Sequence, residues 1–328
     1  MREGWGRNEP EIRLDRAAIE SLVVAAFPAA RIEYCKSARG GLTNTNIEVG
    51  LSAPPSRVNL RLYQGSPKDA GKEAALNALL LRRGLPTARF LYFAKTNPVT
   101  GEPYAILEWI EGARLASIGH GLDEKSQGAL GMRLGEVLAG IHAISFETAG
   151  YLNAELCVEA PIDFRHEAVI AFLRSCLDSG VLSERLGPDL AAALVSFMEG
   201  EGRRLDAWLG EACLVHADFN ASNILVRREE EHGWRIAAVL DWEFAFAGSP
   251  AFDFGNLLRP PLGDKEVFIA AVAQAYQDAG GVLPDDWRAS AKIADLIAWA
   301  DVLRRDIVTP ALIADAALVI RRTISSPQ

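Results

Sequence analysis

The chain has 328 residues, a net charge of −9 and a hydrophobic fraction of 49%. Its length is typical of two domains, and its composition is that of a globular protein. The charge is divided unevenly, because residues 1–108 carry +4 and residues 109–328 carry −13. A chain this acidic argues against nucleic-acid binding, which needs clustered basic residues, and its second part favours a small cationic partner.

Membrane insertion and secretion are not indicated by the sequence. No apolar run reaches the roughly 18 residues of a membrane span, and residues 1–15 lack the apolar core of a signal peptide. The four cysteines form no CxxC pair, so neither a zinc cage nor a disulfide framework is predicted. We therefore expect a cytoplasmic protein with no membrane or nucleic-acid partner, and the sequence leaves its oligomeric state open.

The first third of the chain predicts two helices and five strands. The first helix starts after Asp15, a typical N-cap residue, and its apolar positions are spaced by three and four. Breaks at glycine and proline separate the strands that follow, which favours an antiparallel meander. The expected strands are 31–36, 44–51, 57–63, 89–94 and 103–108, with a second helix at 69–83.

Beyond residue 112 the pattern is mainly helical. Leu130, Leu134, Val137, Leu138 and Ile141 have the spacing of an amphipathic helix. Further helices are expected at 163–177, 188–209, 265–279, 286–305 and 309–322, and a hairpin at 224–228 and 234–240 interrupts them. The sequence thus predicts a small β-rich lobe followed by a larger helical lobe.

The strongest functional signal is the segment HADFNASN at residues 216–223, which lies between an apolar strand and the hairpin. It reads HxDxxxxN, the spacing of a kinase catalytic loop. Phosphoryl transfer to a hydroxyl needs a carboxylate that orients the nucleophile and accepts its proton, and an oxygen ligand for Mg²⁺ nearby. Asp218 and Asn223 provide these two groups.

A second signal is the segment AVLDW at residues 238–242, where the hairpin ends. Asp241 ends the second strand, so it is expected beside the loop that precedes the hairpin. Magnesium takes one or two carboxylates besides nucleotide phosphates, and Asp241, Asn223 and ATP therefore make a sufficient site. Asp218, Asn223 and Asp241 form the predicted catalytic centre.

These residues, with DWE at 241–243 and GSPAFD at 248–253, resemble the aminoglycoside phosphotransferase and choline kinase family. The resemblance covers nearly the whole chain and implies an α+β, protein-kinase-like two-lobe fold. In that fold a small antiparallel β-sheet N-lobe precedes a larger, mainly helical C-lobe, and the cofactors are ATP and Mg²⁺. The residue roles that it implies are Asp218 as catalytic base, Asn223 and Asp241 as metal ligands, and Asp253 as a buried brace of the catalytic loop.

The N-terminal part offers candidates for nucleotide binding in the segment RGGLTNTN at residues 39–46. Glycines between two strands let backbone N–H groups approach phosphates, although an ordinary hairpin turn explains them as well. With the downstream motifs, the candidate nucleotide-binding residues here are Gly40, Gly41, Thr43 and Asn44.

Arg61 lies on the next strand, where kinases keep a phosphate-binding lysine, and the family resemblance covers arginine there as well. Its expected partner is Glu73, which lies on the apolar face of the following helix, because an inward carboxylate needs a cation. The segment AILEWIEG at 105–112 resembles the kinase hinge. The backbone groups of Glu108 and Ile110 are therefore predicted to contact adenine.

Several other side chains have structural explanations. His142 is expected to be a hydrogen-bonded histidine at the edge of the core, and His216 a brace of its own loop. Trp287 and Trp299 lie on predicted helices, where aromatic residues usually pack in the core.

Three acidic residues are candidate ligands for an acceptor amine. Asp163 and Glu167 are one turn apart on a predicted helix, and Glu243 follows the predicted metal ligand. A solvated acidic face is an equally good explanation.

The sequence therefore predicts an N-lobe at 1–108, a hinge at 109–112 and a C-lobe at 113–328, in a kinase for a small, cationic, amino-sugar-like alcohol. A metabolic kinase for choline, homoserine or a related small alcohol is one alternative, and a non-catalytic nucleotide-binding protein is another. A protein kinase is disfavoured, because the predicted metal ligand Asp241 is followed by Trp-Glu and no APE element is present. The acceptor and the preference for ATP or GTP stay open.

Overall fold

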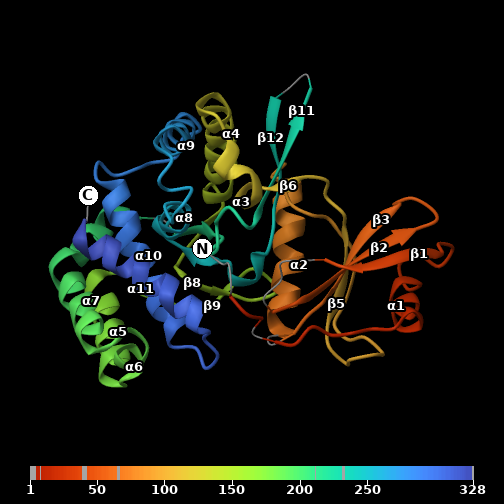
Figure 1. The fold of residues 1–328 in the computed structure, drawn as a ribbon, viewed down its shortest axis with the longest axis horizontal. Coiled ribbons are helices and arrows are strands. Elements are labelled where there is room, and N and C mark those ends of the chain that lie inside the picture. The colour runs from red at the N-terminus through yellow and green to blue at the C-terminus, as the bar shows by residue number, and fades with distance from the viewer. Residues whose placement is uncertain are drawn as a thin grey trace.

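The computed structural model describes residues 5–7, 9–38, 43–64, 67–210, 212–230 and 233–326. Figure 1 shows an N-terminal sheet on one side and a larger helical part on the other. The sheet is antiparallel in the order β1-β2-β3-β5-β4. Its strands are β1 (Ile32–Ser37), β2 (Thr45–Leu51), β3 (Arg57–Leu62), β4 (Phe90–Ala94) and β5 (Tyr104–Glu108). The predicted α+β kinase-like fold is confirmed.

The first helix, α1 (Arg16–Val23), begins as expected. Asp15 caps it by accepting a hydrogen bond from the Ala18 N–H at 2.8 Å. Ile19, Leu22 and Val23 are buried and pack with residues of the sheet, so the apolar face of α1 covers part of this lobe.

The second helix, α2 (Pro67–Arg82), lies between the sheet and the helical part (Figure 1). Ala70 packs with residues of the sheet, including Tyr63 and Leu107. Leu76 and Leu80, further along the same helix, are fully buried in the core of the helical part. This helix therefore joins the two parts of the fold, and Glu73 lies at the junction.

The helical part is built around α4 (Glu124–His142), which packs along α9 (Glu266–Asp278). Gly131 and Gly135 permit this approach, because a Cβ at either position would collide with the backbone of α9. The other helices are α3 (Leu115–Ile118), α5 (His166–Asp178), α6 (Val181–Leu186), α7 (Pro188–Glu201), α8 (Ala251–Leu257), α10 (Trp287–Leu303) and α11 (Pro310–Ser325), with 3₁₀ turns η1 (Gly119–Gly121), η2 (Gly202–Trp208) and η3 (Trp242–Phe244).

Two further sheets position the loops of the helical part. One consists of β12 (Gly233–Val239), β11 (Ile224–Glu229) and β6 (Ala113–Arg114), so the predicted hairpin is confirmed and the chain leaving the first lobe pairs with it. The other consists of β7 (Ser145–Phe146), β10 (Ala212–Val215), β13 (Phe246–Gly248), β8 (Gly150–Leu152) and β9 (Val158–Pro161). Among the described residues, no helix is long and apolar enough to cross a membrane.

Candidate active site

The HADFNASN loop joins β10 to β11, and the side chain of Asp253 hydrogen-bonds to its backbone. This fully buried carboxylate accepts one hydrogen bond on each oxygen, from the backbone N–H groups of His216 and Ala217, both at 2.9 Å. Ala217 has a left-handed backbone with φ of 67°, an unfavourable conformation for alanine. The hydrogen bonds that Asp253 accepts fix this turn, so the expected bracing contact is confirmed.

The two histidines near the loop have the structural contacts that the sequence predicts. His216 is fully buried, its Nδ1 accepts a hydrogen bond from the Asp218 N–H at 3.1 Å, and its Nε2 donates to the Leu240 carbonyl at 2.9 Å. His142 lies with Nε2 3.2 Å from Asp253 and Nδ1 3.0 Å from the Tyr276 hydroxyl. Both rings therefore support the loop.

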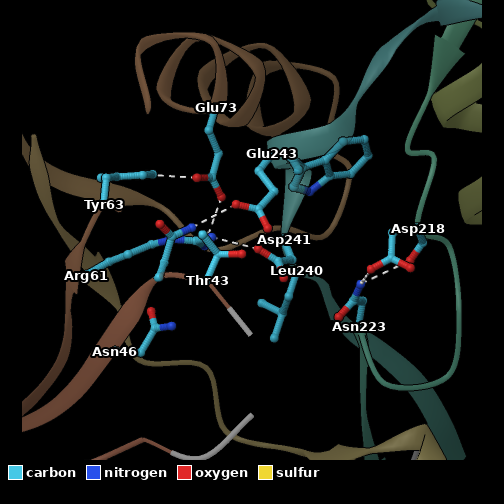
Figure 2. A network of polar contacts seen from close by, with 12 residues as sticks. Thr43, Asn46, Arg61, Tyr63, Glu73, Asp218, Asn223, Leu240, Asp241 and Glu243 are labelled. Carbon is cyan, nitrogen blue, oxygen red and sulfur yellow. Dashed lines mark hydrogen bonds and ion pairs between the residues drawn. The ribbon is translucent and has the colours of Figure 1, made fainter. Parts of the chain in front are cut away.

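Asp218 and Asn223 face each other across the loop (Figure 2). The Asn223 side-chain nitrogen donates to Asp218 Oδ2 at 2.8 Å, and the Asn220 side-chain nitrogen donates to Asp218 Oδ1 at 2.6 Å. The amide oxygen of Asn223 is therefore turned away from Asp218. Asn220 was not singled out from the sequence, although an asparagine two residues after the motif aspartate is a signal for such a contact.

Asp241 follows β12 and lies next to the end of the loop, as predicted. The Leu240 N–H donates to the Asn223 carbonyl at 2.8 Å, which ties the hairpin's end to the loop. Asp241 has a left-handed backbone with φ of 70°. Its carboxylate lies 2.6 Å from Arg61 Nη2, an ion pair across the two lobes that the sequence did not predict (Figure 2).

Arg61 on β3 also contacts Glu73 on α2, which confirms the predicted pair. Arg61 Nη1 lies 3.0 Å from Glu73 Oε1, and the Tyr63 hydroxyl donates to Glu73 Oε2 at 2.8 Å. Burial favours loss of the arginine proton, but Glu73 and Asp241 outweigh it and raise the pKa of Arg61. The guanidinium therefore stays charged at the junction of the lobes.

Glu243, a predicted acceptor ligand, lies beside this network and lines the same cavity as Asp163. The Asn44 side-chain nitrogen donates to Glu243 Oε2 at 2.8 Å, and Lys72 Nζ donates to the Glu243 carbonyl at 2.7 Å. Burial, reinforced by the nearby Asp241 carboxylate, raises the pKa of Glu243 to about 8. Glu243 therefore contacts Asn44, a predicted nucleotide-binding residue, and its own role as an acceptor ligand stays a prediction.

This pKa predicts that Glu243→Gln flattens the pH dependence of stability. The unfolded chain releases this proton near pH 4.3, but the folded protein holds it until about pH 8. The folded state binds more protons in between, so the contribution to stability is full at low pH and is lost as the pH rises. Urea unfolding from pH 5 to pH 8, without nucleotide or metal, should show a smaller decline for Glu243→Gln. Exposed Glu155→Gln should follow the parent, and an unchanged slope for Glu243→Gln would mean that the carboxyl is ionised.

Asp163 and Glu167 are not one helical turn apart, which corrects the sequence prediction. Asp163 Oδ1 accepts a hydrogen bond from the Arg165 N–H at 2.9 Å. This contact forms a turn before the helix, so α5 begins only at His166. Asp163 also pairs with the Arg165 side chain, whose hydrogen bond lowers the pKa of Asp163 to about 2. Glu167 is largely exposed and lies 3.1 Å from His166. Only Asp163 of the two lines the cavity described next.

A cavity of about 410 Å³ opens beside the catalytic loop. Asp218, Asp241, Glu243 and Thr43 line one end of it, and side chains from α5, α10 and the β8–β13 region line the rest. Trp299, expected in the core, is buried but also forms part of this wall. Trp287 packs on Phe254 with ring centroids 5.2 Å apart, as a core residue does.

The remaining predicted nucleotide-binding residues are only partly described. Gly40 and Gly41 lie outside the described residues. Glu108 ends β5 and its N–H donates to the Arg89 carbonyl at 2.8 Å. Ile110 packs in the small cluster that includes Leu107 and Leu240, at the junction of the lobes. Their contacts with adenine stay predictions.

Aminoglycoside phosphotransferases are among the solved structures that are similar to this chain. The GDP complex of wild-type aminoglycoside 2′-phosphotransferase-IIIa has a TM-score of 0.71 and 16% identity, over 95% of this chain and 99% of its own. The gentamicin complex of APH(2″)-IIa has a TM-score of 0.66 and 17% identity, over 95% and 97%. A thermostable mutant of APH(4)-Ia with ADP and hygromycin B has a TM-score of 0.64 and 18% identity, over 93% and 98%. At these identities the likeness establishes the fold.

The curated relatives are longer proteins. Acyl-CoA dehydrogenase family member 11 of Mus musculus is 23% identical over 261 residues, which are 76% of this chain and 31% of the relative. The protein of the same name from Rattus norvegicus is 24% identical over 187 residues, 57% of this chain and 22% of the relative. The chain thus spans less than a third of the curated relatives it matches. A model of the phosphotransferase enzyme family matches residues 35–293, most of the chain. The chain therefore belongs to the phosphotransferase enzyme family.

Proposed function

We propose that this protein transfers the γ-phosphoryl group of ATP, with Mg²⁺, to a hydroxyl of a small molecule. One observation carries the proposal: Asp218 and Asp241 line the same end of a cavity, and Asp241 contacts the buried Arg61–Glu73 pair. Phosphoryl transfer requires mainly positioning and charge stabilisation, and this end of the cavity gathers the groups for both.

In this proposal Asp218 orients the acceptor hydroxyl and accepts its proton. The amide groups of Asn220 and Asn223 hold the Asp218 carboxylate in place. Arg61, kept charged by Glu73, binds the phosphates of the nucleotide. The reaction needs a base at the acceptor hydroxyl and a positive charge at the phosphates, and Asp218 and Arg61 provide them.

The oxygen atoms of Asn223 and Asp241 fit a magnesium ion. A carboxylate and an amide oxygen are ligand types that Mg²⁺ accepts, and the Leu240–Asn223 hydrogen bond keeps the two residues adjacent. The ion supplies positive charge that neutralises the phosphate oxygens. Asp241 uses Oδ1 for its pair with Arg61, so a metal ion held by Asp241 would lie near the guanidinium that is proposed to bind the phosphates.

The turn with Gly40, Gly41, Thr43 and Asn44 is proposed to cover the phosphates, and the hinge near Glu108 and Ile110 to contact the base. Related structures contain GDP or ADP. ATP is proposed as the phosphoryl donor because the sequence resemblance implies it. A cytoplasmic location belongs to the same proposal.

Three alternatives for the function follow from the sequence. An amino-sugar-like cation is supported by the −13 charge of residues 109–328 and by complexes of related structures with gentamicin and hygromycin B. A metabolic kinase for choline, homoserine or a related small alcohol uses the same catalytic residues. A non-catalytic nucleotide-binding protein has no need for Asp218, Asn223 and Asp241 together, and their joint presence argues against it.

Asp241→Asn tests the proposed magnesium site. The change removes the only charged ligand proposed for the metal, so the Mg²⁺ concentration for half-maximal ATP turnover should rise by roughly tenfold or more. ADP release is measured across a Mg²⁺ series at saturating ATP, with circular dichroism to check folding. Asp264→Asn, an exposed pair partner of Arg322, is the matched control. A titration that matches the parent would assign the metal to another residue.

A further inference from the structure

We infer that the acceptor is an alcohol whose body is mainly apolar, with its polar end at Asp218. The inference rests on the proposed phosphotransferase function and concerns the part of the cavity beyond the catalytic end. It departs from the cationic, amino-sugar-like acceptor that the overall charge favours.

Part of the cavity wall is aromatic. Phe164, Phe246 and Phe252 pack against one another with ring centroids 5.0 to 5.7 Å apart, and all three line the cavity. Phe172 and Trp299 extend this wall from α5 and α10. A sugar with many hydroxyl groups finds few hydrogen-bond partners against such rings, whereas a hydrocarbon or ring body gains from contact with them.

Two aromatic side chains of the cavity remain exposed to solvent. Tyr151 is 52% exposed and Phe244 is 39% exposed, and both belong to the large hydrophobic residues that the fold leaves uncovered. An apolar ligand that covers them removes apolar surface from water, which contributes roughly 25 cal/mol per Å². These two rings are therefore the part of the wall that a ligand body completes.

The charges beyond the catalytic end are already paired within the protein. Asp163 contacts Arg165, and Asp301 contacts Arg304 at 2.9 Å and Arg305 at 3.4 Å. Arg259 pairs with Asp295 at 2.7 Å and lies over the Trp299 ring. The acidic surplus of the lobe is therefore not directed at this part of the cavity, and a cationic acceptor would compete with arginines for each carboxylate there.

A series of ω-phenylalkanols, from phenylmethanol to 5-phenylpentanol, tests the inference on the full chain. Binding is measured by calorimetry with Mg²⁺ and a non-hydrolysable ATP analogue, and phosphorylation by ester formation with ATP. Each added methylene contributes about 0.8 kcal/mol when buried, so Kd should fall about three- to fourfold per step until the cavity is full. Kanamycin and choline serve as cationic comparators and should bind more weakly than the longer alcohols at every salt concentration.

Variants of the exposed rings locate the binding. Tyr151→Ala and Phe244→Ala should each weaken binding of 5-phenylpentanol by roughly tenfold and reduce the gain per methylene. Leu209→Ala removes an apolar side chain of similar exposure, 47%, outside the cavity and should change nothing.

The outcomes separate the two proposals. The apolar acceptor is overturned if affinity does not increase with each methylene. It is also overturned if kanamycin or choline binds more tightly than the alcohols, with an affinity that falls as the salt concentration rises. Phosphorylation of either cation would still support the phosphotransferase function. Tight binding of the longer alcohols without ester formation from any acceptor supports the apolar cavity and counts against the phosphotransferase.

Discussion

Asp218→Ala should lower the rate of phosphoryl transfer by roughly 10²–10⁴, the range for loss of a general base, while Mg·ATP affinity changes by only a few fold. The carboxylate lines the cavity and is oriented by Asn220 and Asn223, whereas Arg61 on the nucleotide side pairs with Glu73 and Asp241. Its loss should therefore affect the acceptor side of the reaction and spare the nucleotide side. Calorimetry with Mg·ATP and single-turnover phosphorylation measure the two effects separately.

Asn220→Ala is the matched control for this experiment. Asn220 contacts the same carboxylate through one hydrogen bond, while Asn223 still holds the other oxygen. We expect a loss of less than about tenfold, since a neutral hydrogen bond contributes about 1 kcal/mol. Near-normal turnover of Asp218→Ala would remove this residue from the mechanism.

Asp253→Ala should lower the free energy of unfolding by roughly 3–5 kcal/mol, the largest stability effect expected of a single site residue. The change leaves two buried backbone N–H groups without an acceptor and removes the partner of His142 Nε2. Urea unfolding monitored by fluorescence gives the difference. Turnover should also fall, because the left-handed backbone of Ala217 loses the contact that fixes it.

Two variants serve as comparisons for the stability of Asp253→Ala. Asp253→Asn keeps one acceptor oxygen and should lose clearly less stability than Asp253→Ala. Asp264→Ala removes a carboxylate whose pair with Arg322 is about half exposed, and should change the unfolding free energy by less than about 1 kcal/mol. An Asp253→Ala protein as stable as the parent would show that the loop does not depend on this brace.

The parts of the fold that sequence predicts well are those with a local cause. Asp15 caps α1 within three residues, and the spacing of Leu130, Leu134 and Leu138 buries one face of α4. The short strands β7, β8 and β13 were missed, because two or three residues are too few to display alternation. Their pairing is determined by distant neighbours in the fold.

In the site, too, contacts with a local cause were predictable and contacts between distant residues were not. The Arg61–Glu73 contact was predictable, because an inward carboxylate on α2 requires a cation close by. The Arg61–Asp241 pair joins residues 180 positions apart, and no local pattern indicates it. Asp163 was misplaced because its own carboxylate forms a turn with Arg165, which competes with the helical conformation that the apolar spacing favours.

The cavity wall was the least predictable feature. Phe164, Phe246 and Phe252 come from separate elements, and each alone reads as an ordinary core residue. Net charge of the lobe gave no information on it, because charge on a whole surface bears on solubility as much as on ligands.

Transfer of label from ATP with ¹⁸O in its γ-phosphoryl group tests the central claim most directly. The full chain is incubated with Mg²⁺, labelled ATP and a mixture of alcohols that includes the phenylalkanols, kanamycin and choline, and the products are analysed by mass spectrometry. We predict a labelled phosphate ester on an alcohol with the parent protein and loss of nearly all of it with Asp218→Ala. Label found only in inorganic phosphate, or ester formed equally fast by Asp218→Ala, would contradict the account.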